Sequence, residues 1–311
     1  MASSNTAIAE NLKKRAADYT AARGRVSRRI VVCAGTGCIA NGSLKVYEAL
    51  KKIAEEKKLD VTVKLDPCDH GKKDVLLTHS GCQGFCQVGP LVTIDPDGIL
   101  YTHVKPEDVT EIVEQTLLGG TIIDRLLYTD PSNGQHKKGK SEITFYNRQQ
   151  RIVLGACGVV DPEDINEYIS NGGYEGARKA LFDMEPQQVC EEMKASGLRG
   201  RGGAGFPTGR KWELALRQKE SEKYIICNGD EGDPGAFMDR SVLEGNPHSV
   251  VEGMIIGSRA TGAHTGYVYV RAEYPLAVAR IRRAVADARE AGFLGKNIMG
   301  SDHSFDIRVM E

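Results

Sequence analysis

The chain has 311 residues and a formal net charge of −1 at pH 7, a length that suits about two domains with ordinary hydrophobic cores. The near-neutral charge gives no reason to expect a nucleic-acid partner, and no apolar run reaches the roughly 18 residues of a membrane span. The basic N-terminal segment lacks the apolar core of a secretory signal, so we expect a cytoplasmic protein. Its eight cysteines then favour thiolate ligands or buried thiols over disulfides.

Hydrophobic periodicity and turn chemistry predict a small α/β domain over residues 29–120, preceded by a helical extension over residues 1–28. The expected elements are a strand over 29–35, a helix over 44–58, strands over 61–65 and 75–78, hairpin strands over 91–94 and 99–104, and a helix over 106–118. Residues 121–150 include a polar, turn-rich stretch and are expected to form a linker.

Residues 151–311 alternate between helical and strand patterns, which predicts a second α/β domain with a mostly parallel sheet. The expected helices cover 162–170, 173–182, 185–196, 212–218, 248–260 and 276–291, and the expected strands cover 224–227, 267–271 and 305–309.

Four cysteines form two loop pairs. Cys33 and Cys38 have four residues between them, Cys82 and Cys86 have three, and both pairs lie in glycine-bearing sequence. Pairs that hold one zinc ion usually have two intervening residues, so the wider spacing favours a [2Fe-2S] cluster with two thiolates on each iron. A zinc site and buried or redox-active thiols are the alternatives. The other cysteines are expected to be structural or free thiols: Cys68, Cys157, Cys190 and Cys227.

Residues 197–212 form a glycine-rich segment that also contains arginines, a lysine and two aromatic residues. Glycines let a backbone approach a flat or phosphorylated ligand closely, and the cations can neutralise phosphate. Gly200, Gly202 and Gly205 match the G-x-G-x-x-G fingerprint, but the segment follows a predicted helix rather than a strand, so an ordinary Rossmann turn is not expected. The alternative is a flexible loop.

An acidic loop, residues 228–235, follows a predicted strand at the place where α/β sheets form ligand crevices. Carboxylates there would repel phosphate and suit the hydroxyl groups of a ribose or ribityl chain. The alternative is a set of turns that cap helices.

The segments GLRGRGGAGFPTGRKW (197–212) and CNGDEGDPGAFMDR (227–240) resemble the FMN- and NADH-binding flavoprotein subunit of respiratory complex I. The resemblance is closer still to the matching diaphorase subunit of NAD(P)-linked, often electron-bifurcating, hydrogenases and formate dehydrogenases. It covers about residues 29–311 and implies the α/β fold class: a thioredoxin-like [2Fe-2S] ferredoxin domain over 29–120, then a Rossmann-like FMN/NAD(H)-binding domain over 151–311. Because that family continues beyond the last predicted strand, we expect this domain to be C-terminally incomplete.

The resemblance also implies site residues, with no general acid or base among them. The residues that would hold the FMN phosphate and ring edge are Gly200, Arg201, Gly202, Gly203 and Lys211, with Asn228 and Asp230 contacting the flavin. Phe206 would stack on the adenine of the nucleotide, beside Glu231 and Asp233. Two positions depart from the family: Asp233 stands where glutamate is usual, and Leu214 where an aromatic residue is usual.

The implied function is that of an electron-transfer flavoprotein subunit. It would exchange hydride between NAD(H) or NADP(H) and FMN, and pass electrons through iron–sulfur clusters to other subunits of a hydrogenase or formate dehydrogenase, with ferredoxin as a further partner. A [4Fe-4S] cluster is expected only in a longer form of the chain. The alternatives are a non-catalytic [2Fe-2S] relay and assembly subunit, whose incomplete flavin fold is a docking platform, and a flavin-free NAD-binding regulator.

Overall fold

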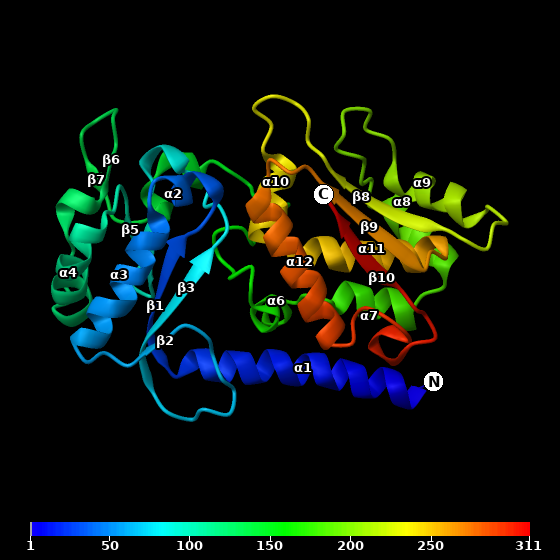
Figure 1. Ribbon diagram of the computed structural model, residues 1–311, viewed down its shortest axis with the longest axis horizontal. Coiled ribbons are helices and arrows are strands. Elements are labelled where there is room, and N and C mark those ends of the chain that lie inside the picture. Colours follow the sequence, from blue (N-terminus) through cyan, green and yellow to red (C-terminus); the bar gives the residue numbers. More distant parts are fainter. Residues whose placement is uncertain (1) are drawn as a thin grey trace. The chain divides into compact units, whose positions relative to one another are not determined.

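The computed structural model describes residues 2–311, with side chains from residue 10 onward. The chain forms two units (Figure 1). The N-terminal unit comprises Ala17–Asp164 with Glu244–Asn246, and the C-terminal unit comprises the stretch up to Ala16, Ile165–Leu243 and Pro247–Glu311. Among the described residues, no helix is both long and apolar enough to span a membrane.

A five-stranded sheet forms the centre of the N-terminal unit, with strand order β2-β3-β1-β4-β5. Strands β1 and β3 are parallel, as are β2 and β3, whereas β4 is antiparallel to both β1 and β5. The strands are β1 (Val26–Cys33), β2 (Val61–Thr62), β3 (Lys73–Ser80), β4 (Val92–Asp95) and β5 (Ile99–Tyr101). The helices are α2 (Thr36–Ala40), α3 (Ser43–Glu56) and α4 (Val109–Glu111), the last continuing as a π-helix over Ile112–Leu118. The strand–helix–strand, hairpin and helix order predicted from the sequence is confirmed.

Helix α3 covers this sheet because its apolar residues recur on one face. Val46, Tyr47, Leu50 and Ala54 are buried and pack in one core with strand residues such as Ile30. The spacing of three and four residues between them is that of an amphipathic helix.

Residues 121–150, expected to form a linker, are bonded to the same unit. They contain the paired strands β6 (Tyr128–Thr129) and β7 (His136–Lys137) and the short helix α5 (Thr144–Asn147). The N–H of Leu100 donates to the carbonyl of Lys138 at 2.8 Å, and that of Thr102 to the carbonyl of Leu126 at 2.7 Å. Buried apolar side chains add to these bonds, because Ile123, Leu126 and Leu127 belong to the core of the unit. The domain boundaries drawn from the sequence stay a prediction.

Helix α1 (Ala2–Gly24) contributes buried residues to both units. Leu12 is buried in the core of the C-terminal unit, whereas Tyr19 and Ala22 are buried in a small separate cluster of the N-terminal unit together with Val26, Leu65 and Leu76. The helix ends at Gly24, four residues before the predicted end of the helical extension at residue 28. Strand β1 accordingly begins at Val26 rather than at residue 29.

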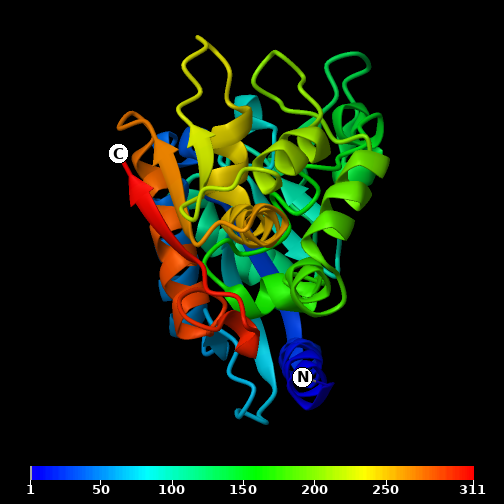
Figure 2. The same ribbon diagram turned by 90° about the vertical axis from the view of Figure 1, so that its right-hand side faces the viewer.

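The C-terminal unit contains a three-stranded parallel sheet of order β10-β9-β8, whose strands lie side by side in Figure 2. Its strands are β8 (Tyr224–Gly229), β9 (Thr265–Val270) and β10 (Asp306–Met310). Its helices are α6 (Ile165–Ser170), α7 (Glu175–Phe182), α8 (Pro186–Ala195), α9 (Thr208–Leu216), α10 (Met238–Gly245), α11 (Pro247–Thr261) and α12 (Pro275–Glu290). The predicted mostly parallel sheet is confirmed.

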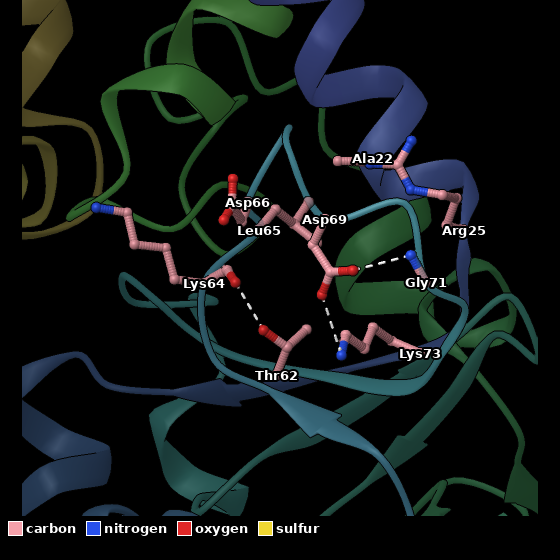
Figure 3. Close-up of a pocket in the computed structure, with 9 residues that line it drawn as sticks. All are labelled: Ala22, Arg25, Thr62, Lys64, Leu65, Asp66, Asp69, Gly71 and Lys73. Atoms are coloured by element: carbon pink, nitrogen blue, oxygen red, sulfur yellow. Dashed lines mark hydrogen bonds and ion pairs between the residues drawn. The ribbon is translucent and has the colours of Figure 1, made fainter.

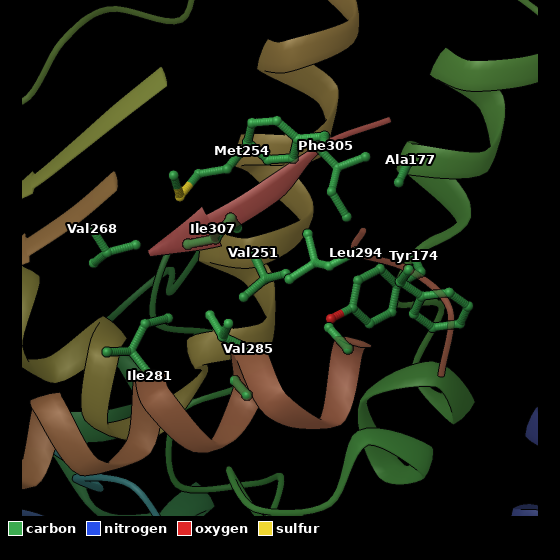
Figure 4. Close-up of a cluster of buried hydrophobic side chains, with 14 of the residues drawn as sticks. Tyr174, Ala177, Val251, Met254, Val268, Ile281, Val285, Leu294, Phe305 and Ile307 are labelled. Carbon is green, nitrogen blue, oxygen red and sulfur yellow. The ribbon is translucent and has the colours of Figure 1, made fainter. Parts of the chain in front are cut away.

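The helices of this unit pack on one face of the sheet. The chain crosses from β8 to β9 to β10 in one direction, and crossovers of the usual right hand then lie on the same side. Val251 of α11 and Ile281 of α12 meet Val268 of β9 in the core drawn in Figure 4. The opposite face keeps apolar side chains in solvent, among them Ile226, whose side chain is 68% exposed.

Candidate functional site

The four predicted cysteine ligands lie together in the N-terminal unit. Cys33 ends β1 and pairs in register with Ser80 at the end of the parallel strand β3. Loops that follow neighbouring parallel strands leave the sheet at the same edge, which brings the loop of Cys38 to that of Cys82 and Cys86. The Sγ atoms of Cys82 and Cys86 are 3.5 Å apart, and the thiol of Cys38 donates a hydrogen bond to Cys33.

Glycines make room for this approach. A Cβ atom at Gly35 would lie 2.7 Å from the Cβ of Cys82, and one at Gly89 would lie 2.6 Å from the Sγ of Cys38. Such distances do not occur between real side chains, so these positions require glycine. The N–H of Gly84 donates to the Sγ of Cys82 at 3.3 Å, which is the type of bond that stabilises thiolates in iron–sulfur sites.

Hydrogen bonding and burial together set the charge on the sulfur atoms. The bond from Cys38 lowers the pKa of Cys33 and raises that of Cys38. The pKa of Cys82 is also raised, by its bond with Cys86 and by burial. Metal binding at these thiols therefore releases protons.

Glu244 holds the first cysteine loop from a distant part of the sequence. Its carboxylate accepts hydrogen bonds from the backbone N–H of Thr36 at 3.1 Å and from the Thr36 hydroxyl at 2.5 Å. Thr36 begins α2, the helix that carries Cys38. The sequence analysis missed Glu244, because no local pattern links residues that are 208 positions apart.

An aromatic cluster covers the cysteine loops. Phe85, between Cys82 and Cys86, stacks on Phe145 with ring centroids 4.8 Å apart and meets Tyr146 edge-on at 5.5 Å. Cys33 and Cys38 pack in the same hydrophobic cluster as Phe85. The cluster limits solvent access to Cys33 and Cys38, whereas Cys82 is half-buried and Cys86 is exposed.

The cysteine site fits a [2Fe-2S] cluster in its donor set, its two pairs of sulfur atoms and its surrounding glycines. Within the part of the chain that the structure describes, no group of three or more His, Cys, Asp or Glu side chains is placed to hold a metal ion as the side chains stand. The ligand roles of Cys33, Cys38, Cys82 and Cys86 stay a prediction.

The remaining cysteines lie elsewhere. Cys68 is exposed in the loop after β2, beside a pocket of about 40 Å³ in which Asp69 contacts Gly71 and Lys73 (Figure 3). That volume has room for little more than water. Cys157 and Cys190 are buried and Cys227 is half-buried, and burial raises the pKa of Cys157 and Cys227 to about 11.

A cavity of about 580 Å³ lies in the C-terminal unit, within the roughly 300–1,000 Å³ typical of ligand pockets. The glycine-rich segment forms one side of it, and the acidic loop after β8 forms the other. It is lined by Gly200, Arg201, Gly202, Gly203, Lys211, Asn228, Asp230, Glu231, Gly232, Asp233, Ala236, Met238 and Asp239. Apart from Phe206, every cofactor-binding residue predicted from the sequence lines this cavity.

The glycine-rich segment is a closed loop. It follows helix α8, as the helix predicted over residues 185–196 led us to expect. The N–H of Gly200 donates to the carbonyl of Phe206 at 2.9 Å, and that of Thr208 to the carbonyl of Leu198 at 3.0 Å. These bonds fix the base of the loop, and α9 begins directly after it. The side chains of Arg201 and Lys211 have no hydrogen bond or ion pair with any described residue, so both charges are available to a bound phosphate.

Gly202 is a glycine that neither packing nor backbone conformation requires. A Cβ atom at Gly202 would meet nothing within 4 Å, and its backbone is not in the left-handed region, whereas Gly203 has a φ of 91°. Gly202 lines the cavity, so the absence of a side chain there leaves the backbone open to a ligand. This fits the close approach of a flat cofactor such as FMN.

The acidic loop combines helix capping with an open carboxylate. Both oxygens of Glu231 accept backbone N–H bonds at the start of α10, from Asp239 at 2.8 Å and Arg240 at 3.1 Å. Burial and the nearby Glu231 raise the pKa of Asp239. Glu231 therefore caps helix α10, which is the alternative role that the sequence analysis left open for this loop, and it also lines the cavity. Asp233 lines the cavity too, and it is exposed.

Phe206 lies at the base of the glycine loop and not among the residues that line the cavity. Its side chain is 39% exposed, and the guanidinium of Arg210 lies over its ring, 5.9 Å from the centroid. The exposed ring offers a stacking surface outside the cavity, which is compatible with the adenine contact expected from the sequence.

Comparisons with known proteins match both halves of the chain. Residues 19–117 match the family model of the thioredoxin-like [2Fe-2S] ferredoxin, and residues 193–311 match that of the Nuo51 FMN-binding domain. A solved structure of a thioredoxin-like [2Fe-2S] ferredoxin from Aquifex aeolicus is 32% identical with a TM-score of 0.26, covering 33% of this chain and 97% of that one.

Two curated relatives illustrate the range of matches. The NADP-reducing hydrogenase subunit HndC of Solidesulfovibrio fructosivorans is 58% identical over 166 residues, which is 53% of this chain and 34% of the relative. One NADH-quinone oxidoreductase subunit of Escherichia coli (strain K12) is 48% identical over 149 residues, which is 48% of this chain and 34% of the relative. The chain thus spans about a third of the length of these relatives. It carries two domains of known families, a thioredoxin-like [2Fe-2S] ferredoxin domain followed by a Nuo51 FMN-binding domain, as its motifs predict.

Proposed function

We propose that this chain is the nucleotide-oxidising flavoprotein subunit of a larger redox complex, with FMN in the glycine-lined cavity and a [2Fe-2S] cluster on the four cysteines. The observation that carries the proposal is the cavity itself, which gathers the glycine-rich and acidic motifs in one unit. Support also comes from the names of two relatives, a subunit of an NADP-reducing hydrogenase and one of an NADH-quinone oxidoreductase.

The residues of the cavity would position the cofactor by charge and shape. Arg201 and Lys211 neutralise the FMN phosphate, and Gly202 and Gly203 allow the ring edge to lie against the backbone. Asn228 and Asp230 bond polar groups of the flavin. FMN, when bound, supplies the ability to take up a hydride from NADH or NADPH and release its electrons one at a time.

The proposal extends to partners, and the names of the two relatives support subunits of hydrogenase and quinone-reductase type. The complex would contain further subunits of hydrogenase, formate dehydrogenase or quinone-reductase type, in the cytoplasm, with ferredoxin as a second electron donor or acceptor if the complex bifurcates electrons. A [4Fe-4S] cluster would belong to sequence beyond these 311 residues. No general acid or base is needed, because the chain contributes position and electrostatics.

A second candidate function is a [2Fe-2S] relay without flavin chemistry. The observation in its favour is that Cys33 and Cys38 are buried in a hydrophobic cluster of their own unit, whereas much of the cavity lining is exposed, including Arg201, Gly202 and Asp233.

An optical titration separates the two functions. The complex that contains this chain is purified without oxygen and titrated with NADH and with NADPH. The proposed function requires a flavin absorption band that bleaches with one of the nucleotides, and Lys211→Glu should lower flavin content by charge repulsion at the phosphate. A complex with a reducible cluster and no flavin in the wild type would establish the relay instead.

A further inference from the structure

Tyr146 carries a buried hydroxyl that the protein does not use. The residue lies in α5, where its backbone N–H donates to the carbonyl of Ile143 at 2.9 Å. Its hydroxyl oxygen is inaccessible to solvent and has no hydrogen-bond partner among the described residues. A buried hydroxyl without a partner costs stability that a phenylalanine at the same position would not. A tyrosine here therefore calls for a partner outside the polypeptide.

The surroundings of Tyr146 indicate where that partner lies. Its ring packs against the hydrophobic cluster that contains Cys33 and Cys38. It also meets Phe85, the residue between the two sulfur ligands of the second loop, edge-on at 5.5 Å. Tyr146 thus packs against the hydrophobic cluster of the first cysteine pair and contacts Phe85 of the second cysteine loop.

Two cations lie near Tyr146 and the second cysteine loop. The Lys140 Nζ atom lies 5.9 Å from the centroid of the Tyr146 ring. The guanidinium of Arg151 lies beside the second cysteine loop, where a Cβ at Gly84 would be 3.2 Å from its Nη2 atom. Both positive charges favour negative charge on the group that the cysteines hold.

We propose that the Tyr146 hydroxyl donates a hydrogen bond to the [2Fe-2S] centre, to a sulfide or a ligating thiolate, and thereby raises its reduction potential. Reduction adds an electron to the cluster and no atom to the protein. A donor aimed at sulfur stabilises the added negative charge, so the reduced form gains more from the bond than the oxidised form does. The segment 139–151 is then a tuning element rather than a spacer. The proposal rests on the cluster assigned under the proposed function.

The test compares Tyr146→Phe with Tyr128→Phe in the intact complex. Tyr146→Phe keeps the ring and removes only the hydroxyl. Tyr128 contacts the same Phe85 ring at 5.1 Å, and its hydroxyl is not among the buried atoms that lack a partner. Measurements are the cluster midpoint potential by EPR-monitored titration, and the exchangeable-proton couplings of the reduced cluster by ENDOR in H₂O and D₂O.

We expect Tyr146→Phe to keep its iron and sulfide content, shift the midpoint to more negative potential, and lose one strongly coupled exchangeable proton. Tyr128→Phe should match the wild type in both measurements. An unchanged potential and proton coupling in Tyr146→Phe would overturn the proposal and leave the hydroxyl bonded to water. Absence of any [2Fe-2S] signal in the wild type would instead refute the cluster assignment, so the two failures are distinguishable.

Discussion

At the scale of single residues, the glycines of this chain answer different physical demands. Gly209 is required by packing, because a Cβ there would lie 2.4 Å from the backbone nitrogen of Lys194 on α8. Gly203 is required by its backbone, with a φ of 91°. Gly202 is required by neither, and it lines the cavity, so its role can be tested against a bound ligand.

Gly202→Ala should therefore separate binding from folding. We expect its unfolding free energy to equal or slightly exceed that of the wild type, because alanine restricts the unfolded chain by about 0.4–1 kcal/mol. FMN affinity should fall at least about tenfold, measured by flavin fluorescence on release from the complex. Gly253→Ala, at an exposed helical position where a Cβ also meets nothing within 4 Å, is the control and should retain FMN. Equal flavin retention in both variants would show that Gly202 is not needed for FMN binding.

The cysteine assignment has an equally direct comparison within the chain. Cys82→Ala should abolish the visible and EPR spectra of the [2Fe-2S] cluster, because it removes one of four thiolates, and leave flavin content largely intact. Cys68→Ala is the matched control, since Cys68 is exposed and outside both pairs. Persistence of the cluster spectrum in Cys82→Ala would show that the ligand set is wrong.

At the scale of elements, helix α11 carries one buried histidine, His248, and contacts a second, His303. His248, on α11, contacts the Tyr174 hydroxyl at 2.8 Å through Nδ1, and His303 contacts the α11 residue Ser258 at 2.9 Å through Nε2. Burial lowers the pKa of His248 from 6.5 to about 3 and that of His303 from 6.5 to about 4. Both imidazoles are thus neutral in the folded protein at neutral pH.

These depressed values make the unit acid-sensitive. Below about pH 6.5 the unfolded chain binds protons that the folded chain does not, so stability is complete above that pH and falls as pH drops toward about 4. The urea midpoint of the C-terminal unit should accordingly decrease between pH 7.5 and pH 5. His248→Gln should reduce this slope, and His70→Gln, on an exposed loop, should not. A pH-independent midpoint would contradict the burial argument.

The elements themselves could largely be predicted from the sequence, because each has a local cause. The periodicity of α3, the strand before Cys33 and the turn chemistry of residues 95–98 all correspond to observed elements. Segment 121–150 is predicted to be a linker because its polar stretch outweighs its apolar residues, yet Ile123, Leu126 and Leu127 are buried in the core and backbone bonds attach the segment to β5. Glu244 and the aromatic contacts of Phe85 likewise depend on the fold and not on spacing.

Glu244 supplies a prediction that only the structure allows. Glu244→Ala removes the acceptor for the N–H and hydroxyl of Thr36, a loss of about 1–3 kcal/mol at the loop of Cys38. Cluster loss to an iron chelator should accelerate. Glu244→Gln, which keeps an acceptor, should lie between this variant and the wild type. Identical chelation rates in all three proteins would show that Glu244 does not position the loop.

At the scale of the whole molecule, the chain has two large hydrophobic cores, one in each unit. The cysteine site belongs to the first unit and the cavity to the second. Each cofactor should therefore stabilise its own unit, because a ligand that binds only the folded form adds to the stability of the part that binds it. Removal of iron should lower the thermal transition of the N-terminal unit, and removal of FMN that of the C-terminal unit, by differential scanning calorimetry.

The central claim is that one chain carries an FMN that accepts electrons from NADH or NADPH together with a [2Fe-2S] cluster. The most direct measurement is the iron, acid-labile sulfide and flavin content of the complex purified without oxygen, followed by EPR after addition of each nucleotide. After the clusters of other subunits are subtracted, the account predicts two iron and two sulfide per FMN, as expected for one [2Fe-2S] cluster and one FMN on this chain. It also predicts that a nucleotide bleaches the flavin and produces the EPR signal of the reduced cluster. A complex that contains the cluster but lacks FMN, or whose FMN stays oxidised with both nucleotides, would contradict it.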